Sequence, residues 1–160
     1  MKKNALFITR AAVIAALYVV LTLFISAFNL ASGAIQVRIS EALTILPVFT
    51  PAAIPGVAIG CLLSNIITGC ALPDIIFGTL ATLIGAIGTY LLRKTKFIFT
   101  LPPVVSNAVI IPFVLRYAYG LSDAYWFLFL TVGAGEIISV MILGTILYKA
   151  LKPISPKLFG

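Results

Sequence analysis

Glu136 lies inside a long apolar segment that runs from residue 124 to residue 148. A carboxylate in the hydrocarbon region of a bilayer is costly, so it normally faces the interior of a helix bundle and has a partner there. Asn107 lies at a similar depth in the preceding apolar segment, and Gly133 and Gly135 leave room beside the carboxylate. We therefore predict that Glu136 and Asn107 form the floor of a ligand pocket. The alternative is a hydrogen bond between helices that only fixes their packing.

Four polar side chains are predicted at the outer ends of the helices, around the mouth of this pocket: Arg38, Glu41, Asn65 and Asp74. Each also has a simpler interpretation. Arg38 and Glu41 are three residues apart and would suit an ion pair on one helix. Asp74 follows a proline and would suit a helix cap, and Asn65 would suit an interhelical hydrogen bond. The gathering of these residues on one side of the membrane favours a binding site.

Aromatic side chains collect near the same predicted face, at Tyr117, Tyr119, Tyr125 and Trp126. The simplest interpretation is a belt of aromatic rings at the membrane interface. Flat rings would equally suit stacking on a planar ligand, and we count Tyr117 and Trp126 as candidate ligand contacts for that reason.

Small residues follow a spacing of four in the first apolar segment, where Ala11 precedes Ala15 and Ala12 precedes Ala16. Such pairs let another helix approach closely. They predict either a docking surface for a partner protein or packing within the bundle itself.

The composition decides what kind of elements must hold these residues. The chain is 62% hydrophobic and only 9% charged, which lies outside the range of soluble globular proteins. A membrane-spanning helix needs about 20 mostly apolar residues, and the sequence offers such stretches repeatedly. We therefore predict a single integral membrane domain over residues 1–160, in contact with the lipid bilayer.

The positive charges predict the orientation of this domain. They form three clusters without an acid among them: Lys2, Lys3 and Arg10, then Arg93, Lys94 and Lys96, then Lys149, Lys152 and Lys157. By the positive-inside rule all three clusters, and hence both termini, face the cytoplasm. The net charge of +7 thus reports topology and contact with anionic lipids, and it does not indicate nucleic-acid binding.

Two cytoplasmic termini require an even number of spans. The apolar run 42–73 is too long for one span and contains three prolines, so we divide it. The prediction is an all-α bundle of six transmembrane helices at about 8–29, 38–50, 53–70, 74–92, 101–118 and 123–149. The second helix is short, so it would be tilted, kinked or not fully spanning.

The sequence disfavours catalysis. It has no histidine, which removes the commonest metal ligand and general base, and we predict no cofactor and no metal. It also lacks the G-x-x-x-x-G-K-[ST] loop of ATP-hydrolysing proteins. A pocket on helices that cannot use ATP by that route suits a subunit that captures a small molecule.

Several short segments add a more specific signal: IQVRISEAL at 35–43, LP at 46–47, TPAAIPG at 50–56, GCLLSN at 60–65, GCALPD at 69–74 and FG at 77–78. Together they resemble the QueT family, and the likeness extends over nearly the whole chain. Proteins of that family are regarded as substrate-binding S components of energy-coupling factor (ECF) importers. Their substrates are regarded as queuosine precursors, which are 7-deazaguanine bases or close relatives.

The resemblance implies a six-helix S component with its site near the extracellular face of the cell membrane. It also implies three partners, namely a transmembrane T component and two cytoplasmic ATPase subunits. The alanine pairs on the first segment match the A-x-x-x-A motif with which such proteins dock on the T component. Three readings remain as alternatives: an S component for another vitamin-like substrate, a small membrane enzyme, and a purely structural membrane subunit.

Overall fold

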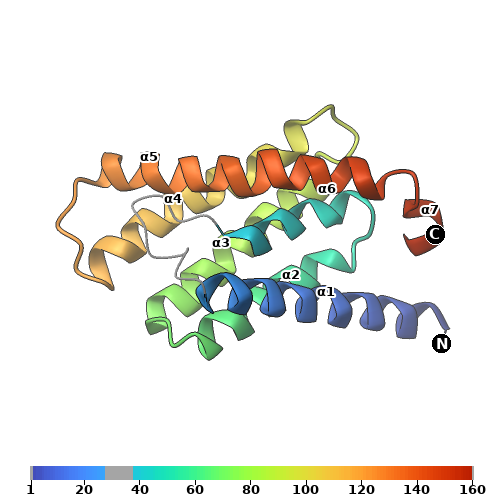
Figure 1. Ribbon diagram of the computed structural model, residues 1–160, viewed down its shortest axis with the longest axis horizontal. Coiled ribbons are helices and arrows are strands. Elements are labelled where there is room, and N and C mark those ends of the chain that lie inside the picture. Colours follow the sequence, from blue (N-terminus) through green and yellow to red (C-terminus); the bar gives the residue numbers. More distant parts are fainter. Residues whose placement is uncertain (1, 28–37, 160) are drawn as a thin grey trace.

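The computed structural model describes residues 2–27 and 38–159, and these residues form helices and the turns between them, with no strand among them. The helices are α1 (Lys2–Ala27), the 3-10 helix η1 (Ile39–Val48), α2 (Ala53–Ile67), α3 (Leu72–Leu91), the 3-10 helix η2 (Ile98–Thr100), α4 (Leu101–Tyr117), α5 (Tyr125–Glu136), the π-helix η3 (Ile137–Leu143), α6 (Gly144–Leu151) and α7 (Ser155–Phe159). Most run along the long axis of an elongated bundle (Figure 1).

Four helical stretches are long and apolar enough to cross a membrane: Lys3–Ala27, Leu72–Leu91, Ile98–Ala118 and Tyr125–Leu151. The last stretch joins α5, η3 and α6 into one rod. Large hydrophobic side chains are exposed along these helices, as expected where lipid takes the place of water. The prediction of an all-helical, multi-pass membrane protein is confirmed. The count of six spans and the cytoplasmic position of the termini stay predictions.

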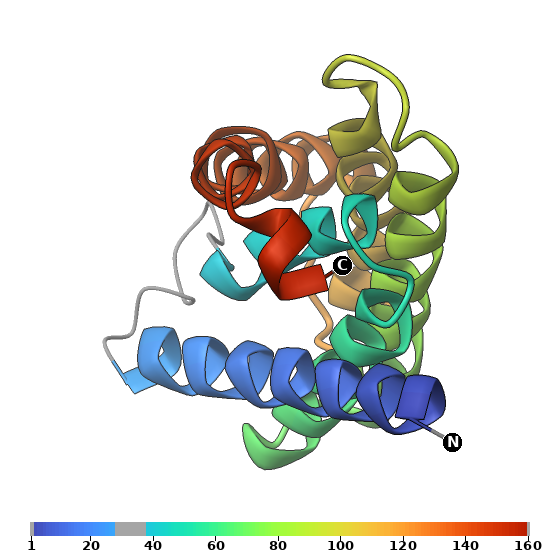
Figure 2. The ribbon, with the colours of Figure 1, turned by 90° about the vertical axis from the view of Figure 1, so that its right-hand side faces the viewer.

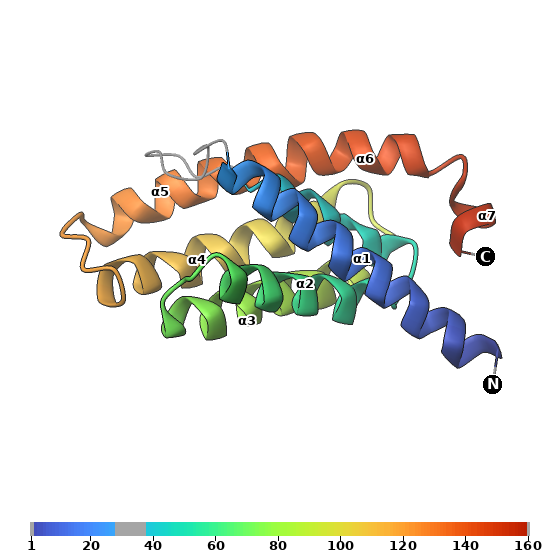
Figure 3. The same cartoon turned by 60° about the horizontal axis from the view of Figure 1, so that its bottom comes forward.

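The helices lie close to their predicted bounds, with two differences. The first begins at Lys2 instead of residue 8, and the short α7 follows the last predicted helix. Both termini lie at one end of the molecule, whereas the turn between α2 and α3 and the turn between α4 and α5 lie at the other (Figures 1 and 3). Figure 3 also shows α1 crossing the bundle obliquely.

The short helix η1 lies at the centre of the bundle, surrounded by the longer helices (Figure 2). Every residue from Ser40 to Pro47 is buried. A 3-10 helix rises about 2 Å per residue, so its ten residues cover about 20 Å and do not cross a hydrocarbon core about 30 Å thick. The second predicted helix is therefore too short to span by itself.

Glycines bring the outer helices close together. A Cβ atom at Gly60 of α2 would lie 2.6 Å from the Cβ of Tyr18 on α1, and one at Gly85 of α3 would lie 2.6 Å from the Cα of Pro103 on α4. A side chain at either position would push the paired helices apart.

Apolar and aromatic side chains fill the bundle at the end where the termini lie. The ring centroid of Phe49 lies 5.3 Å from that of Tyr148 and 5.8 Å from that of Phe159, and the Phe99 ring lies 5.0 Å from Tyr148. Stacked and tilted rings of this kind add about 0.5–1.5 kcal/mol per pair beyond the burial of their area. These contacts join the end of η1 to α6 and α7.

Candidate ligand-binding site

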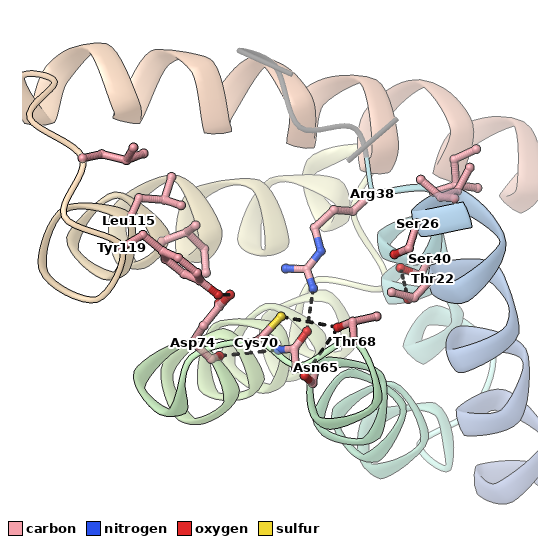
Figure 4. Close-up of a pocket in the computed structure, with 14 residues that line it drawn as sticks. Thr22, Ser26, Arg38, Ser40, Asn65, Thr68, Cys70, Asp74, Leu115 and Tyr119 are labelled. Carbon is pink, nitrogen blue, oxygen red and sulfur yellow. Dashed lines mark hydrogen bonds between the residues drawn. The ribbon is translucent and has the colours of Figure 1, made fainter. Parts of the chain in front are cut away.

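A cavity of about 380 Å³ opens at the end of the bundle opposite the termini, between α1, α2, α4 and the start of η1 (Figure 4). This volume lies within the range of small-molecule sites in proteins. The lining combines apolar and polar side chains: Thr22, Ile25, Ser26, Arg38, Ile39, Ser40, Asn65, Thr68, Cys70, Asp74, Ile111, Leu115, Tyr119 and Leu121. Three of the predicted site residues, Arg38, Asn65 and Asp74, thus meet at one cavity.

Arg38 reaches across the cavity toward α2 (Figure 4). Its Nη2 donates a hydrogen bond of 3.0 Å to Oδ1 of Asn65. Its backbone N–H donates to Oγ of Ser139, at 3.1 Å, and the Ser139 hydroxyl donates to the Gly135 carbonyl. The guanidinium therefore bonds an amide on another helix instead of the nearby Glu41 on its own helix.

Asp74 and Tyr119 join two turns at the rim of the cavity. The Tyr119 hydroxyl donates to Oδ2 of Asp74 at 2.9 Å and accepts a hydrogen bond from the backbone N–H of Ala71 at 3.1 Å. Partial burial, reinforced by the Asp74 carboxylate, raises the pKa of Tyr119, so the hydroxyl keeps its proton and remains the donor. Ala71, and not Asp74, is the N-cap residue of α3.

Glu41 lies deeper and is 0% exposed. Its Oε1 accepts hydrogen bonds from the hydroxyl groups of Tyr18 and Thr82, the latter at 3.3 Å. Its Oε2 is buried and has no hydrogen-bond partner. One oxygen of this carboxylate is thus held by the protein, while the other lacks a donor.

Glu136, the last residue of α5, is also buried and is 4% exposed. Asn107 is its hydrogen-bond partner, so the two residues that the sequence placed at one depth do meet. The Asn107 amide also donates to the Pro103 carbonyl at 3.2 Å. Oε2 of Glu136 is buried without a partner. The π-helix η3 begins at the next residue. Such segments are rare in proteins overall, but they occur frequently at functional sites.

The two carboxylates belong to a layer one helical turn, about 5.4 Å, below the cavity lining. On three helices, the residue four positions before a cavity residue lies deeper in the bundle and belongs to this layer. These residues are Tyr18 before Thr22 on α1, Cys61 before Asn65 on α2, and Asn107 before Ile111 on α4. We call this set, with Glu41, Thr82 and Glu136, the carboxylate layer.

Five of the eight predicted contact residues are absent from the cavity lining. Glu41, Asn107 and Glu136 are buried below the lining, so the predicted floor does not itself line the cavity, and Tyr117 and Trp126 lie away from it. Tyr117 is 79% exposed and Trp126 is 71% exposed, and neither lines the cavity. Tyr117 instead borders an apolar groove of about 460 Å³ on the outside of α3 and α4. Their positions suit an aromatic belt at the membrane interface.

The structure adds residues that the sequence argument passed over. Tyr18 holds Glu41, and Tyr119 holds Asp74. A signal for the first was present, because Tyr18, Thr22 and Ser26 follow one another at intervals of four and place polar atoms along one face of an otherwise apolar helix.

The alanine pairs of α1 face two different ways. Ala15 is buried against α2, where a Cβ at Gly60 would lie 3.0 Å from its carbonyl oxygen, and the Ala11 carbonyl oxygen lies similarly close to Gly56. Ala12 and Ala16 are exposed on the outside of the bundle. The first pair is therefore occupied by internal packing, and the second pair is accessible.

Comparison with known proteins gives two matches. The family described as QueT transporter matches residues 8–153. A protein of Lactococcus lactis subsp. cremoris (strain MG1363), named "Queuosine precursor transporter QueT", is 39% identical over 85 residues, which are 52% of this chain and 50% of that protein. The chain thus matches about half the length of this relative. No solved structure matches.

Proposed function

This chain belongs to the QueT transporter family, and from that membership we propose that it is the substrate-binding S subunit of an ECF-type importer that captures a queuosine precursor. Membership makes it a transporter component and not an enzyme. The substrate is a small molecule of the 7-deazaguanine type, bound in the cavity beside Arg38, Asn65 and Asp74.

One observation carries this proposal, namely a cavity lined by Arg38, Asn65 and Asp74. Two buried carboxylates, each with one oxygen that lacks a donor, lie below this lining without being part of it. The edge of a guanine-like ring presents adjacent N–H donors, and a carboxylate accepts such a pair. Asn65 offers an amide for the ring carbonyl and ring nitrogens. The apolar side of the cavity, at Ile111 and Leu115, suits the flat face of the ring.

The position of the cavity supports capture from outside the cell. Both termini lie at one end of the bundle (Figure 1), and the residues that line the cavity belong to the other end. Two of the three basic clusters flank the termini, so the positive-inside rule directs that end to the cytoplasm. The cavity then faces the extracellular side of the cell membrane.

Partners supply the energy of transport in this proposal. A transmembrane T component and two cytoplasmic ATPase subunits bind the chain, and the exposed pair Ala12 and Ala16 is the surface on which the T component docks. Small side chains there allow the close approach of another helix within lipid.

Calorimetry on the detergent-purified chain tests the function. We expect saturable binding of a 7-deazaguanine base with one site per chain, and no binding of riboflavin or biotin at the same concentrations. Uptake of the labelled base by cells should require co-expression of the T component and both ATPases. Tight binding of another vitamin in place of the base would keep the S-subunit role and reject the substrate. Uptake by the chain alone would reject the ECF partners.

A further inference from the structure

The apolar groove of about 460 Å³ on the outside of α3 and α4, which we call the outer groove, shares no residue with the cavity lining. The described residues that line it carry no charge: Pro73, Phe77, Val109, Ile110, Phe113, Val114, Tyr117 and Ala118. Phe77 and Phe113 are each about half exposed, at 48% and 49%. Exposed apolar surface of this kind marks a site of contact with lipid or with another molecule.

Aromatic contacts hold one wall of the outer groove in place. The Phe113 ring is stacked on that of Tyr117, with centroids 6.5 Å apart and planes at 6°, and it lies 4.6 Å from the ring of Tyr125. The Tyr125 hydroxyl donates to the Val109 carbonyl at 3.0 Å, which ties α5 to the same wall. Because the protein itself fixes this wall, a ligand that enters the groove pays little for reorganisation.

The outer groove has about the length of a lipid tail within one leaflet. The residues of α4 that line it recur at i, i+1, i+4, i+5 and i+8 between Val109 and Tyr117, which places them on one face of the helix. At 1.5 Å per residue this stretch covers about 12 Å, and half of a hydrocarbon core 30 Å thick is about 15 Å. Since α4 ends at Tyr117, the groove extends from the membrane interface toward the midplane.

A cation lies at the interfacial end of the outer groove. Arg116 belongs to the last turn of α4, three positions after Phe113 and next to Tyr117, and it is exposed. Within the described part of the chain it forms no hydrogen bond or ion pair. A long cationic side chain at the end of a membrane helix reaches the headgroup layer, where a guanidinium binds a phosphate through two parallel N–H donors. An apolar groove with a free guanidinium at its end matches the two parts of a phospholipid.

We propose that the outer groove is a binding site for one anionic phospholipid, whose acyl chain lies in the groove and whose phosphate diester binds Arg116. The headgroup is of the phosphatidylglycerol type, in which the phosphate carries the only charge. A zwitterionic headgroup would also bring an ammonium group close to the guanidinium, and two like charges side by side are unfavourable. This site is separate from the cavity, so the inference holds whichever small molecule the cavity takes.

Photo-crosslinking of the full-length chain in phosphatidylcholine vesicles tests the inference. Two probes are compared in equal trace amounts, a phosphatidylglycerol and a phosphatidylcholine with the same photoreactive acyl chain, and mass spectrometry locates the crosslinked peptides. We expect the phosphatidylglycerol probe to label the groove residues of α3 and α4 about tenfold more than the phosphatidylcholine probe, because a charge-assisted hydrogen bond contributes about that factor.

Two pairs of variants separate the headgroup from the acyl chain. Arg116→Gln should lower labelling by the phosphatidylglycerol probe to the level of the other probe, whereas Lys94→Gln, which removes an exposed cation outside the groove, should leave it unchanged. Val109→Trp fills the groove and should reduce labelling by both probes several-fold. Val105→Trp is its control, because Val105 is 56% exposed one turn away on the same helix and does not line the groove.

Three results would overturn the inference. Labelling spread evenly over the exposed faces of all helices would mean that only bulk lipid contacts the groove. Equal labelling by the two probes, or full labelling of the Arg116→Gln variant by the phosphatidylglycerol probe, would remove the phosphate from Arg116. The comparison of the two probes uses the unsubstituted chain, so it does not depend on the folding of any variant.

Discussion

At the scale of single residues, the site consists of polar side chains that hydrogen-bond to one another. Two of them, the carboxylates of Glu41 and Glu136, each have one oxygen without a donor. Tyr18 and Thr82 donate to one oxygen of Glu41, and Asn107 holds Glu136. Removing a donor from a buried carboxylate costs about 1–3 kcal/mol or more, because the acceptor remains buried. The neighbours of the carboxylates should therefore matter for binding as well as for stability.

We expect Tyr18→Phe to lower the affinity for a 7-deazaguanine base several-fold and to lower the midpoint of thermal unfolding. The ring is retained, so the lost hydrogen bond to Glu41 is the cause. Tyr125→Phe provides the matched control, since the Tyr125 hydroxyl donates to the Val109 carbonyl at 3.0 Å in an exposed position. Calorimetry and thermal unfolding measure both variants. Equal effects of the two substitutions would contradict a special role for Tyr18.

At the rim, Tyr119→Phe should speed dissociation of the bound base several-fold while changing the unfolding midpoint little. The substitution breaks the bond to Asp74 that joins the two turns beside the cavity mouth. Stopped-flow dissociation measures the rate. An unchanged rate would mean that the two turns do not restrict the exit of the ligand.

The sequence predicted part of this site because a charged residue within an apolar segment is costly in lipid, and such a residue can be recognised from the sequence alone. Glu136 and Asn107 were found from depth alone, and the structure places them in contact. The partners of Glu41 were not found, because they come from α1 and α3 and their meeting depends on how the helices rotate. Tyr117 and Trp126 were grouped with the cavity by depth, yet both point outward. The depth of a residue in the membrane follows from counting residues along its helix, whereas the direction in which its side chain faces around the helix axis depends on how the helices pack.

At the scale of helices, α1 shows most directly that packing decides which face of a helix is buried. Its inner pair, Ala11 and Ala15, packs on Gly56 and Gly60 of α2. The helix bounds themselves followed well from hydropathy and proline positions. The central place of η1 did not, because this ten-residue segment is buried on nearly every side and its polar residues give no periodicity that separates an inner face from an outer one.

The two faces of α1 predict different effects of one substitution. Ala15→Leu should destabilise the isolated chain by about 1–3 kcal/mol, as overpacking a close contact does. Ala12→Leu should leave folding and ligand binding intact and weaken co-purification with the T component. Thermal unfolding and affinity co-purification distinguish them. Normal co-purification of the Ala12→Leu variant would remove this surface from the interface.

Gly60→Ala should lower both stability and affinity for the base. The added Cβ would lie 2.6 Å from the Cβ of Tyr18, whose hydroxyl holds Glu41. Gly133→Ala is the control, because its Cβ would make an ordinary contact of 3.7 Å with Ala108. Both variants need only the unfolding midpoint and one binding isotherm. A harmless Gly60→Ala would show that α1 and α2 separate without cost.

At the scale of the whole molecule, the termini lie at one end (Figure 3), and the residues that line the cavity lie at the other. We expect a cysteine at Lys94 to be labelled from the cytoplasm and a cysteine at Arg116 from outside. Both positions are exposed, and the background lacks Cys61 and Cys70. Membrane-impermeant maleimide applied to intact cells makes the measurement. External labelling at position 94 would invert the orientation.

The apolar filling beyond the carboxylate layer makes the cavity a blind end. Ile45, Val57 and Val140 are fully buried there, and the rings around Tyr148 follow behind them. The described interior therefore gives a molecule in the cavity no open path through the bundle. Vesicles that hold the chain alone should retain at most one base per protein at saturation, with no rise in the free internal concentration however long they are incubated. Under the proposed function, each imported molecule requires one complete cycle of binding and release by the protein, so the rate of import equals the rate of these cycles.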